Sequence, residues 1–128
     1  MLNKVVIHIV DGHIQKGTTS DFFPNKDIFH FKDNETGETR EILVKELKAV
    51  FFVKSFEGNP GYHDNDDIER VGFGKKIKIY FNDGETQVGY TQGYAPGRTG
   101  FFVFPSDPNS NNDRCFVVTA ATNNIQYI

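Results

Sequence analysis

The segment KVVIHIVDG at residues 4–12 decides the fold, because it returns 72 positions later, from Lys4 to Lys76, as KIKIYFNDG at residues 76–84. The correspondence continues downstream at glycine, threonine, aromatic, proline and basic positions. These pairs are Gly17 with Gly89, Thr19 with Thr91, Phe22 with Tyr94, Pro24 with Pro96, and Lys26 with Arg98. An internal repeat of this kind predicts two folding units with the same strand order.

Each copy opens with an apolar strand that ends at Asp-Gly. Asp11-Gly12 and Asp83-Gly84 therefore predict two β-hairpins. We expect type I′ turns, in which both central residues have positive φ. The second strands, at residues 13–19 and 85–91, carry Gly17 and Gly89 in their interiors. A glycine inside a strand marks a bend or a close backbone approach, so both are interpreted as barrel corners.

Three further strands complete each copy. Third strands are predicted at residues 27–32 and 100–105, and last strands at 49–54 and 125–128. In the fourth strands, Arg40, Ile42 and Val44 are aligned with Arg114, Phe116 and Val118. A break of about one turn separates the fourth strand from the fifth. This layout predicts an all-β chain of two tandem five-stranded SH3-type small barrels, packed face to face.

The sequence divides into a first barrel at residues 1–54, a connector at 55–74 and a second barrel at 75–128. The connector is rich in glycine and acidic residues, and it carries most of the excess negative charge of a chain whose net charge is −3 at pH 7. Nucleic-acid binding needs a basic patch that releases counterions, and the sequence contains none. Nucleic acid is therefore not the partner that the charges favour.

Two runs of apolar residues, 49–53 and 101–104, contain adjacent phenylalanines. Neighbouring side chains on a strand point to opposite faces, so one ring of each pair must point out of its barrel. We expect the outward rings to meet in an interface between the two barrels. The alternative is an exposed apolar face that binds another protein.

The order of apolar strand, Asp-Gly, bent strand with glycine, long loop and three further strands resembles the Sm-like (Hfq-like) barrel superfamily. That resemblance implies RNA binding. The superfamily places Asp after the loop aromatic, where this chain has Phe23 and Ala95. Its basic signature before the last strand is replaced by Glu46-Leu47 and Ala120-Ala121. We therefore retain the expected fold and not the expected RNA binding.

A closer resemblance is to an uncharacterised bacterial family with no assigned activity. It is carried by the pattern Asp-Gly-x4-Gly-x-Thr-x2-Phe/Tyr-x-Pro, present in both copies, and by the phrase LKAVFFV at residues 47–53. This resemblance implies no substrate, cofactor or site residue.

Two matched loops are the main candidates for a binding site. Each presents an aromatic residue, a proline and a cation: Phe22, Pro24 and Lys26 in the first copy, and Tyr94, Pro96 and Arg98 in the second. Such a composition suits contact with a peptide or a flat ligand. The alternative is that Phe22 and Tyr94 plug the barrel ends while the cations are solvated.

Two polar loops are further candidates. In the loop at residues 106–114, Asn111, Asn112 and Arg114 could supply hydrogen bonds to a partner, although a long hairpin connection explains the same composition. The acidic residues at 63–67 could supply oxygen ligands to calcium. They lack the pattern of a calcium-binding loop, so a solvated acidic loop is the favoured interpretation, and no cofactor or metal is expected.

The four histidines stand in no recognisable catalytic motif, so we predict that the protein is not an enzyme. The single cysteine, Cys115, lies among apolar residues and is predicted to be a small buried hydrophobe. No segment is apolar enough to span a membrane, and the N-terminus runs directly into a strand without a signal peptide, which predicts a cytoplasmic location.

Together these observations favour a non-enzymatic protein-interaction or adaptor module whose partner is another protein. The alternatives are a nucleic-acid-binding Sm-like protein and a module that binds a small ligand or metal. A homo-oligomer is compatible with the sequence.

Overall fold

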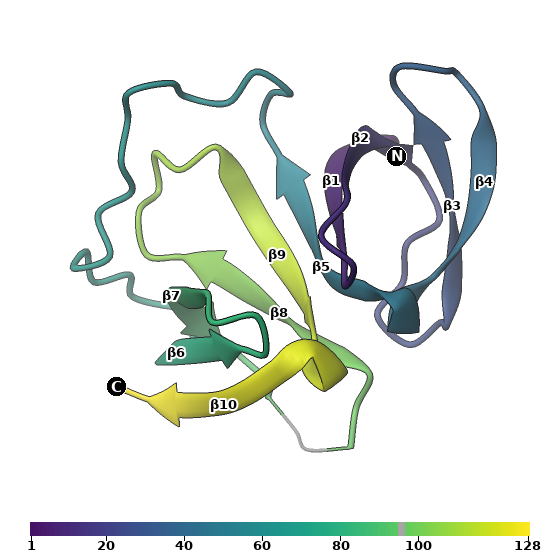
Figure 1. Cartoon of the computed structure of the whole chain (residues 1–128). Coiled ribbons are helices and arrows are strands. Elements are labelled where there is room, and N and C mark those ends of the chain that lie inside the picture. Colours follow the sequence, from purple (N-terminus) through teal and green to yellow (C-terminus); the bar gives the residue numbers. More distant parts are fainter. Residues whose placement is uncertain (95–96) are drawn as a thin grey trace.

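The computed structural model describes residues 1–94 and 97–128, and the chain is all-β with two short 3-10 turns (Figure 1). The first half holds β1 (Asn3–Ile9), β2 (Ile14–Thr19), β3 (Ile28–Asp33), β4 (Thr39–Leu43), η1 (Val44–Glu46) and β5 (Leu47–Val53). The second half holds β6 (Lys75–Phe81), β7 (Thr86–Thr91), β8 (Gly100–Pro105), β9 (Asn112–Val118), η2 (Thr119–Ala121) and β10 (Thr122–Tyr127). The described residues form no helix that is long and apolar enough to cross a membrane.

All ten strands belong to one antiparallel sheet, in the order β10-β6-β7-β8-β9-β5-β1-β2-β3-β4. The all-β prediction is confirmed, but the two separate five-stranded barrels are not. The two halves join edge to edge, because β5 pairs with β9 over Ala49–Val53 and continues the sheet from one half into the other. The sheet is strongly curled and remains open, with β4 and β10 as its outer edges (Figure 1).

The strand pairings of the two halves correspond position by position. Gly17 pairs with Asp33 and Gly89 with Pro105, so residues differ by 72 through the third strand. Ile28 and Gly100 are equivalent, and they pair with Leu43 and Val118 respectively. Leu43 and Val118 are therefore equivalent too, so the difference between equivalent residues becomes 75 from the fourth strand onward. The sequence alignment in the fourth strand was therefore one residue off: the structural equivalent of Arg40 is Cys115, and Arg114 corresponds to Thr39.

The hairpin turns at Asp11-Gly12 and Asp83-Gly84 are present but are not type I′. No described residue other than glycine has positive φ, whereas Gly12 and Gly84 have φ of 101° and 91°. In the first hairpin Gly12 N–H donates to the Ile9 carbonyl at 3.0 Å, and Ile9 N–H donates to the His13 carbonyl at 2.9 Å. This is a three-residue loop, a turn closed by a left-handed glycine. The Asp11 carboxylate fixes it by accepting from the His13 N–H at 2.9 Å.

Gly17 and Gly89 are sites of close strand approach, whereas the barrel corners predicted at these two positions stay a prediction. A Cβ at Gly17 would lie 2.1 Å from the Lys32 carbonyl oxygen. A Cβ at Gly89 would lie 2.5 Å from the Val103 side chain. Only glycine allows β3 and β8 to approach β2 and β7 this closely.

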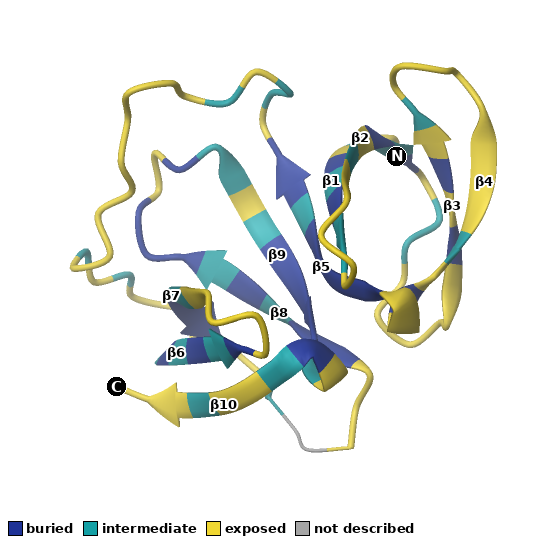
Figure 2. Ribbon diagram, viewed as in Figure 1, coloured by how far each residue is buried: buried dark blue, intermediate teal, exposed yellow. Residues whose placement is uncertain are grey.

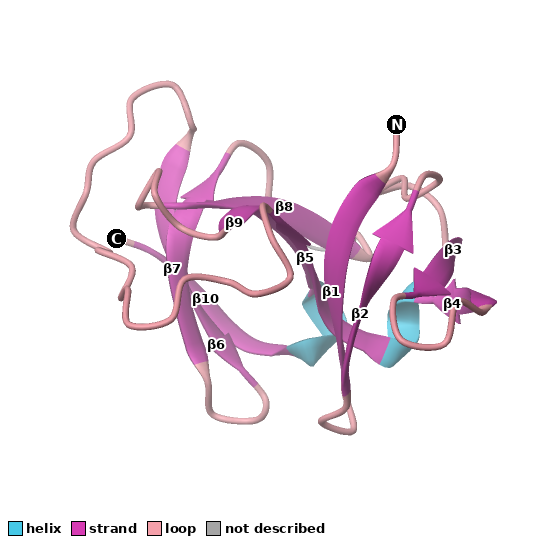
Figure 3. Cartoon of the chain, turned by 90° about the horizontal axis from the view of Figure 1, so that it is seen from above, coloured by secondary structure: helices cyan, strands magenta, loops and turns pink. Residues whose placement is uncertain are grey.

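Two hydrophobic cores lie on opposite sides of a wall made by β5, β8 and β9, which Figure 3 shows between the two halves. The first core contains Phe52 and Phe116, with Phe102 packed against it. The second core contains Phe101, with Phe51 packed against it. The adjacent phenylalanines therefore supply one ring to each core. The wall is buried on both faces, in contrast to the exposed edge strands β4 and β10 (Figure 2).

Candidate functional site

The aromatic residues of the two matched loops pack inward. Phe22 contacts the rings of Phe29, Phe52 and Phe116, with centroids 5.0–5.5 Å apart. Tyr94 stacks edge-on against Phe101 at 4.9 Å and packs on the second core. Both residues therefore plug the ends of their cores, which was the structural alternative to ligand binding.

The remaining residues of these loops are partly brought together. Pro24 of the first half and Arg98 of the second line one cleft of about 260 Å³, here named the junction cleft. Its other lining residues are Gln92, Gly93, Gly100, Phe101, Phe102 and Phe104. Lys26 lies elsewhere, with its Nζ 4.9 Å from the centroid of the Phe23 ring. Pro96 lies outside the described residues.

Two of the three predicted hydrogen-bonding residues of the loop at 106–114, Asn111 and Arg114, use their side chains within the protein's own structure. The Asn111 side chain donates to the Ser55 carbonyl at 2.9 Å and accepts from the Ser55 N–H at 3.2 Å. The Arg114 guanidinium lies over the rings of Phe52 and Phe102, at 4.3 and 5.3 Å from their centroids. Asn112 is half-buried and its N–H donates to Ser110 Oγ at 3.1 Å.

The connector at residues 55–74 forms no strand or helix and is held against the same loop through Asp107. Asp107 is 1% exposed and accepts from the Tyr62 hydroxyl and from the Asn65 N–H, the latter at 2.9 Å. These hydrogen bonds hold the pKa of Asp107 below its ordinary value. Across residues 1–94 and 97–128, no cluster of three or more acidic, histidine or cysteine side chains is placed to hold a metal ion. The hydrogen bonds to Asp107 therefore hold the middle of the connector against the loop at residues 106–114.

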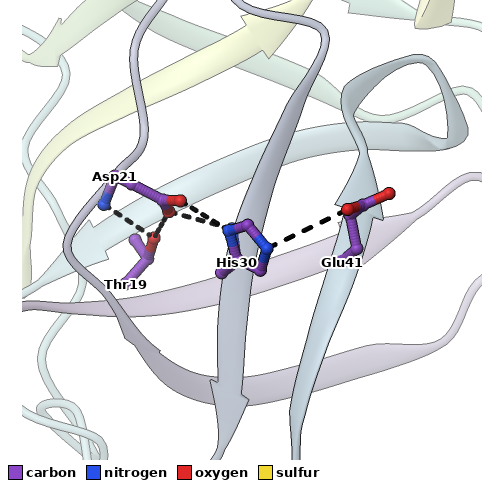
Figure 4. Close-up of polar contacts among 4 residues, drawn as sticks. All are labelled: Thr19, Asp21, His30 and Glu41. Carbon is purple, nitrogen blue, oxygen red and sulfur yellow. Dashed lines mark hydrogen bonds and ion pairs between the residues drawn. The ribbon is translucent and has the colours of Figure 1, made fainter.

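An ionisable cluster that the sequence did not single out lies on the outer face of β3 and β4 (Figure 4). His30 Nδ1 is 2.7 Å from Asp21 Oδ2, and His30 Nε2 is 3.9 Å from Glu41 Oε2. The Thr19 hydroxyl donates to Asp21 Oδ1 at 3.2 Å. His30 and Glu41 are cross-strand partners, so only the strand register brings them together.

The two carboxylates set the protonation state of this cluster. The hydrogen bond and the charge of Asp21 raise the pKa of His30, and the hydrogen bonds from His30 lower the pKa of Asp21. The raised pKa favours the protonated form of the His30 ring. His30 also lines a broad cleft of about 520 Å³, which gathers none of the predicted site residues.

A second unpredicted cluster joins the two halves. Lys48 is 8% exposed, and its ammonium donates to Asp83 Oδ2 at 2.7 Å and Glu85 Oε1 at 2.6 Å. Burial alone would lower the pKa of Lys48, but these two hydrogen bonds outweigh it and the pKa is raised. Nearby, burial and then the charge of Lys48 lower the pKa of His8. Lys48 lies at a β-bulge, because β1 pairs with its neighbours Leu47 and Ala49 and skips Lys48 itself. The alternation of residues along the strand does not reveal this displacement.

The fold and these sites define an all-β protein of two corresponding halves, with a cleft at their junction and no recognisable catalytic constellation among the described residues. A comparison with family models places this class more narrowly: the chain belongs to a family of unknown function, DUF6982, whose model matches residues 1–128. No curated protein and no solved structure matches the chain.

Proposed function

We propose that the protein is a non-enzymatic protein-interaction module that binds a short segment of another protein in the junction cleft. One observation carries this proposal: Pro24 and Arg98, predicted from matched loops of the two halves, line the same cleft. A site built from both halves exists only when they are joined, which suits a module that acts as one unit.

The size and lining of the junction cleft indicate the kind of segment. A cleft of about 260 Å³ is smaller than the ~300–1,000 Å³ of typical small-molecule sites. It accommodates one or two side chains rather than a metabolite. Phe102, Phe104 and Pro24 offer apolar surface, and the exposed Arg98 guanidinium offers a partner for a carboxylate. The segment that fits is an apolar side chain next to Asp or Glu.

The ionisable clusters support a role without chemistry. His30 is flanked by two carboxylates, and Lys48 is held between Asp83 and Glu85. Each of these basic side chains is therefore paired with carboxylates of the protein itself.

We also propose that each half is an SH3-type small barrel of the Sm-like kind and that the chain arose by duplication. The matching strand order and pairing of the two halves support this, as do the close approaches at Gly17 and Gly89. The departures at Phe23 and Glu46 argue against carrying over RNA binding with the fold.

Selection from a random-peptide library, followed by titration of a selected peptide, tests the binding site. We expect enrichment of peptides with an aliphatic or aromatic residue beside Asp or Glu, and shifts of the Gln92, Gly93 and Gly100 amides in NMR spectra. Arg98→Ala should weaken binding about tenfold, the loss of about 1.4 kcal/mol.

The matched control is Lys26→Ala, because Lys26 is the counterpart of Arg98 but does not line the cleft. Peptides that bind equally well to wild-type protein and Arg98→Ala, or a library that yields no enriched sequence, would contradict the proposal.

A further inference from the structure

We propose that the chain also associates with itself, the β4 edge of one copy adding to the β10 edge of another in the way that β9 adds to β5 within the chain. This site is distinct from the junction cleft. It follows from how the two halves are joined and from what occupies the equivalent positions at the free edges.

The internal junction is of the head-to-tail type. The last strand of the first half, β5, pairs with the fourth strand of the second half, β9. The equivalents of these strands are β10 and β4, which are the two outer edges of the sheet. A contact between two different surfaces leaves one copy of each surface free at the ends of the unit, and those free surfaces can meet again between molecules.

The β10 edge carries little protection against strand addition. Residues 122–128, TNNIQYI, include no charged residue and no proline, two features with which natural edge strands discourage pairing. The one irregularity of β10, a register shift between Thr122 and Asn124, lies at the start of the strand. Tyr127 and Ile128 are 58% and 60% exposed. The equivalent of Tyr127 in the first half is Phe52, which is only 4% exposed because the second half covers it. The counterpart of a buried interface residue thus stands uncovered on β10.

The side chains that would meet across such a contact are complementary. At the internal junction, four rings pack together with centroids 5.0–6.2 Å apart: Phe22, Phe52, Phe102 and Phe116. Their equivalents, in the same order, are Tyr94, Tyr127, His30 and Glu41. Two phenylalanines are replaced by tyrosines at one end of the molecule. The two that face them are replaced at the other end by the ionisable residues His30 and Glu41, whose Nε2 and Oε2 atoms lie 3.9 Å apart.

This exchange predicts the strength of the contact. Tyrosine hydroxyls can donate to the Glu41 carboxylate and can form a hydrogen bond with the His30 ring, so the contact between copies would be polar where the internal one is apolar. It would also be weaker, because hydrogen bonds to solvated groups add little net free energy compared with the burial of four phenylalanine rings. We therefore expect reversible, concentration-dependent association.

The internal register specifies which residues pair. Phe52 opposite Arg114 and Phe51 opposite Cys115 translate to Tyr127 opposite Thr39 and Gln126 opposite Arg40 of the next molecule. Directly opposed residues of antiparallel strands have Cα atoms about 4.5–5.5 Å apart, which suits a disulfide bond. Thr39 and Tyr127 are both exposed, so cysteines at these positions should not disturb the fold.

Cross-linking between two single variants tests the register. Thr39→Cys and Tyr127→Cys chains are mixed and oxidised, and the yield of the mixed covalent dimer is measured under non-reducing conditions. We expect that yield to exceed severalfold the yield from Thr39→Cys mixed with Asn123→Cys, in which the second cysteine lies at the far end of β10. Equal yields from the two mixtures would overturn the proposed register.

Sedimentation of the wild-type chain tests association itself. The mean mass should rise with concentration between about 10 μM and 1 mM, the range of weak complexes. Glu41→Lys and Tyr127→Lys should each reduce the rise, whereas Arg98→Ala, which alters only the junction cleft, should not. A chain that stays monomeric throughout this range overturns self-association and leaves peptide binding in the cleft intact.

Discussion

Two histidines on different strands experience opposite surroundings. His30, on the outer face of β3, is paired with Asp21 and approached by Glu41. His8 is half-buried on β1 against the ring of Phe51, within the field of Lys48. The surroundings of His30 favour the protonated ring, and those of His8 disfavour it. The two histidines therefore report two kinds of environment.

NMR titration of the histidine ring protons should show a pKa above 6.5 for His30 and below 6.5 for His8, because hydrogen bonding to Asp21 acts on the first and burial on the second. Asp21→Asn should bring the pKa of His30 back towards 6.5. Asp11→Asn, which removes a carboxylate from the hairpin turn instead, should leave it unchanged. A His30 pKa that does not respond to Asp21→Asn would contradict the pairing.

The linked effect on stability has a defined sign. Because the folded pKa of His30 is raised, its contribution is fully present below about pH 6.5 and is lost as the pH rises through the folded pKa. The folded pKa of His8 is lowered, so its contribution is present above about pH 6.5 and is lost as the pH falls. The free energy of unfolding of Asp21→Asn, measured with urea, should therefore be lower than that of the wild type on the acidic side of neutrality.

At the scale of the element, strand positions and the two hairpin pairings were readable from the sequence, and the strand pairing that joins the two halves was not. Asp-Gly turns and interior glycines located the first two strands of each half, since both depend on local backbone geometry. The pairing of β5 with β9 depends on which free edges meet, and alternation of apolar residues carries no such information. The adjacent phenylalanines did indicate a wall buried on both faces.

The candidate site, like the fold, was predictable only in part from the sequence. Pro24 and Arg98 were predicted because the two matched loops repeat the same pattern of aromatic residue, proline and cation. Both residues line the junction cleft. Asn111 and Arg114 were chosen for their chemistry alone, and the fold uses both internally. The contacts of His30 were not predicted, because its partners Asp21 and Glu41 come from a loop and from the neighbouring strand, at distances in sequence that no motif records.

The hairpin between β6 and β7 is attached to β5 through Lys48, and this contact should contribute to stability. Lys48→Met keeps the apolar stem but removes the hydrogen bonds to Asp83 and Glu85. Both carboxylates are well exposed, so we expect a loss of only about 1 kcal/mol in the free energy of unfolding. Urea denaturation at low salt measures it, and the loss should shrink near 1 M salt as the charges are screened.

Lys45→Met is the comparison for this variant, since Lys45 is an exposed lysine three positions earlier, on η1. If both substitutions have the same effect, the ion pairs of Lys48 contribute nothing specific.

At the scale of the whole molecule, the two cores share their strands and should unfold together. Cys115 reports on this, because it is fully buried in the second core while its neighbour Phe116 belongs to the first. Burial raises the pKa of the Cys115 thiol to about 12, so the folded protein holds almost no reactive thiolate.

We therefore expect a thiol reagent to modify Cys115 only as the chain unfolds globally. Across a urea titration, the fraction of reactive thiol should follow the loss of β-sheet circular dichroism in a single transition. Thiol reactivity that precedes the spectroscopic change would mean that the second half opens on its own.

The wall of β5, β8 and β9 also affects how the protein is made. Synthesis proceeds from the N-terminus, yet the first core needs Phe102, Phe116 and Val118. The 64 residues that separate Lys54 from Val118 take about 3–13 seconds to add at ~5–20 residues per second. Until the strands of the second half have been made, Phe52 lacks its partner rings Phe102 and Phe116, so the nascent chain carries an uncovered apolar surface.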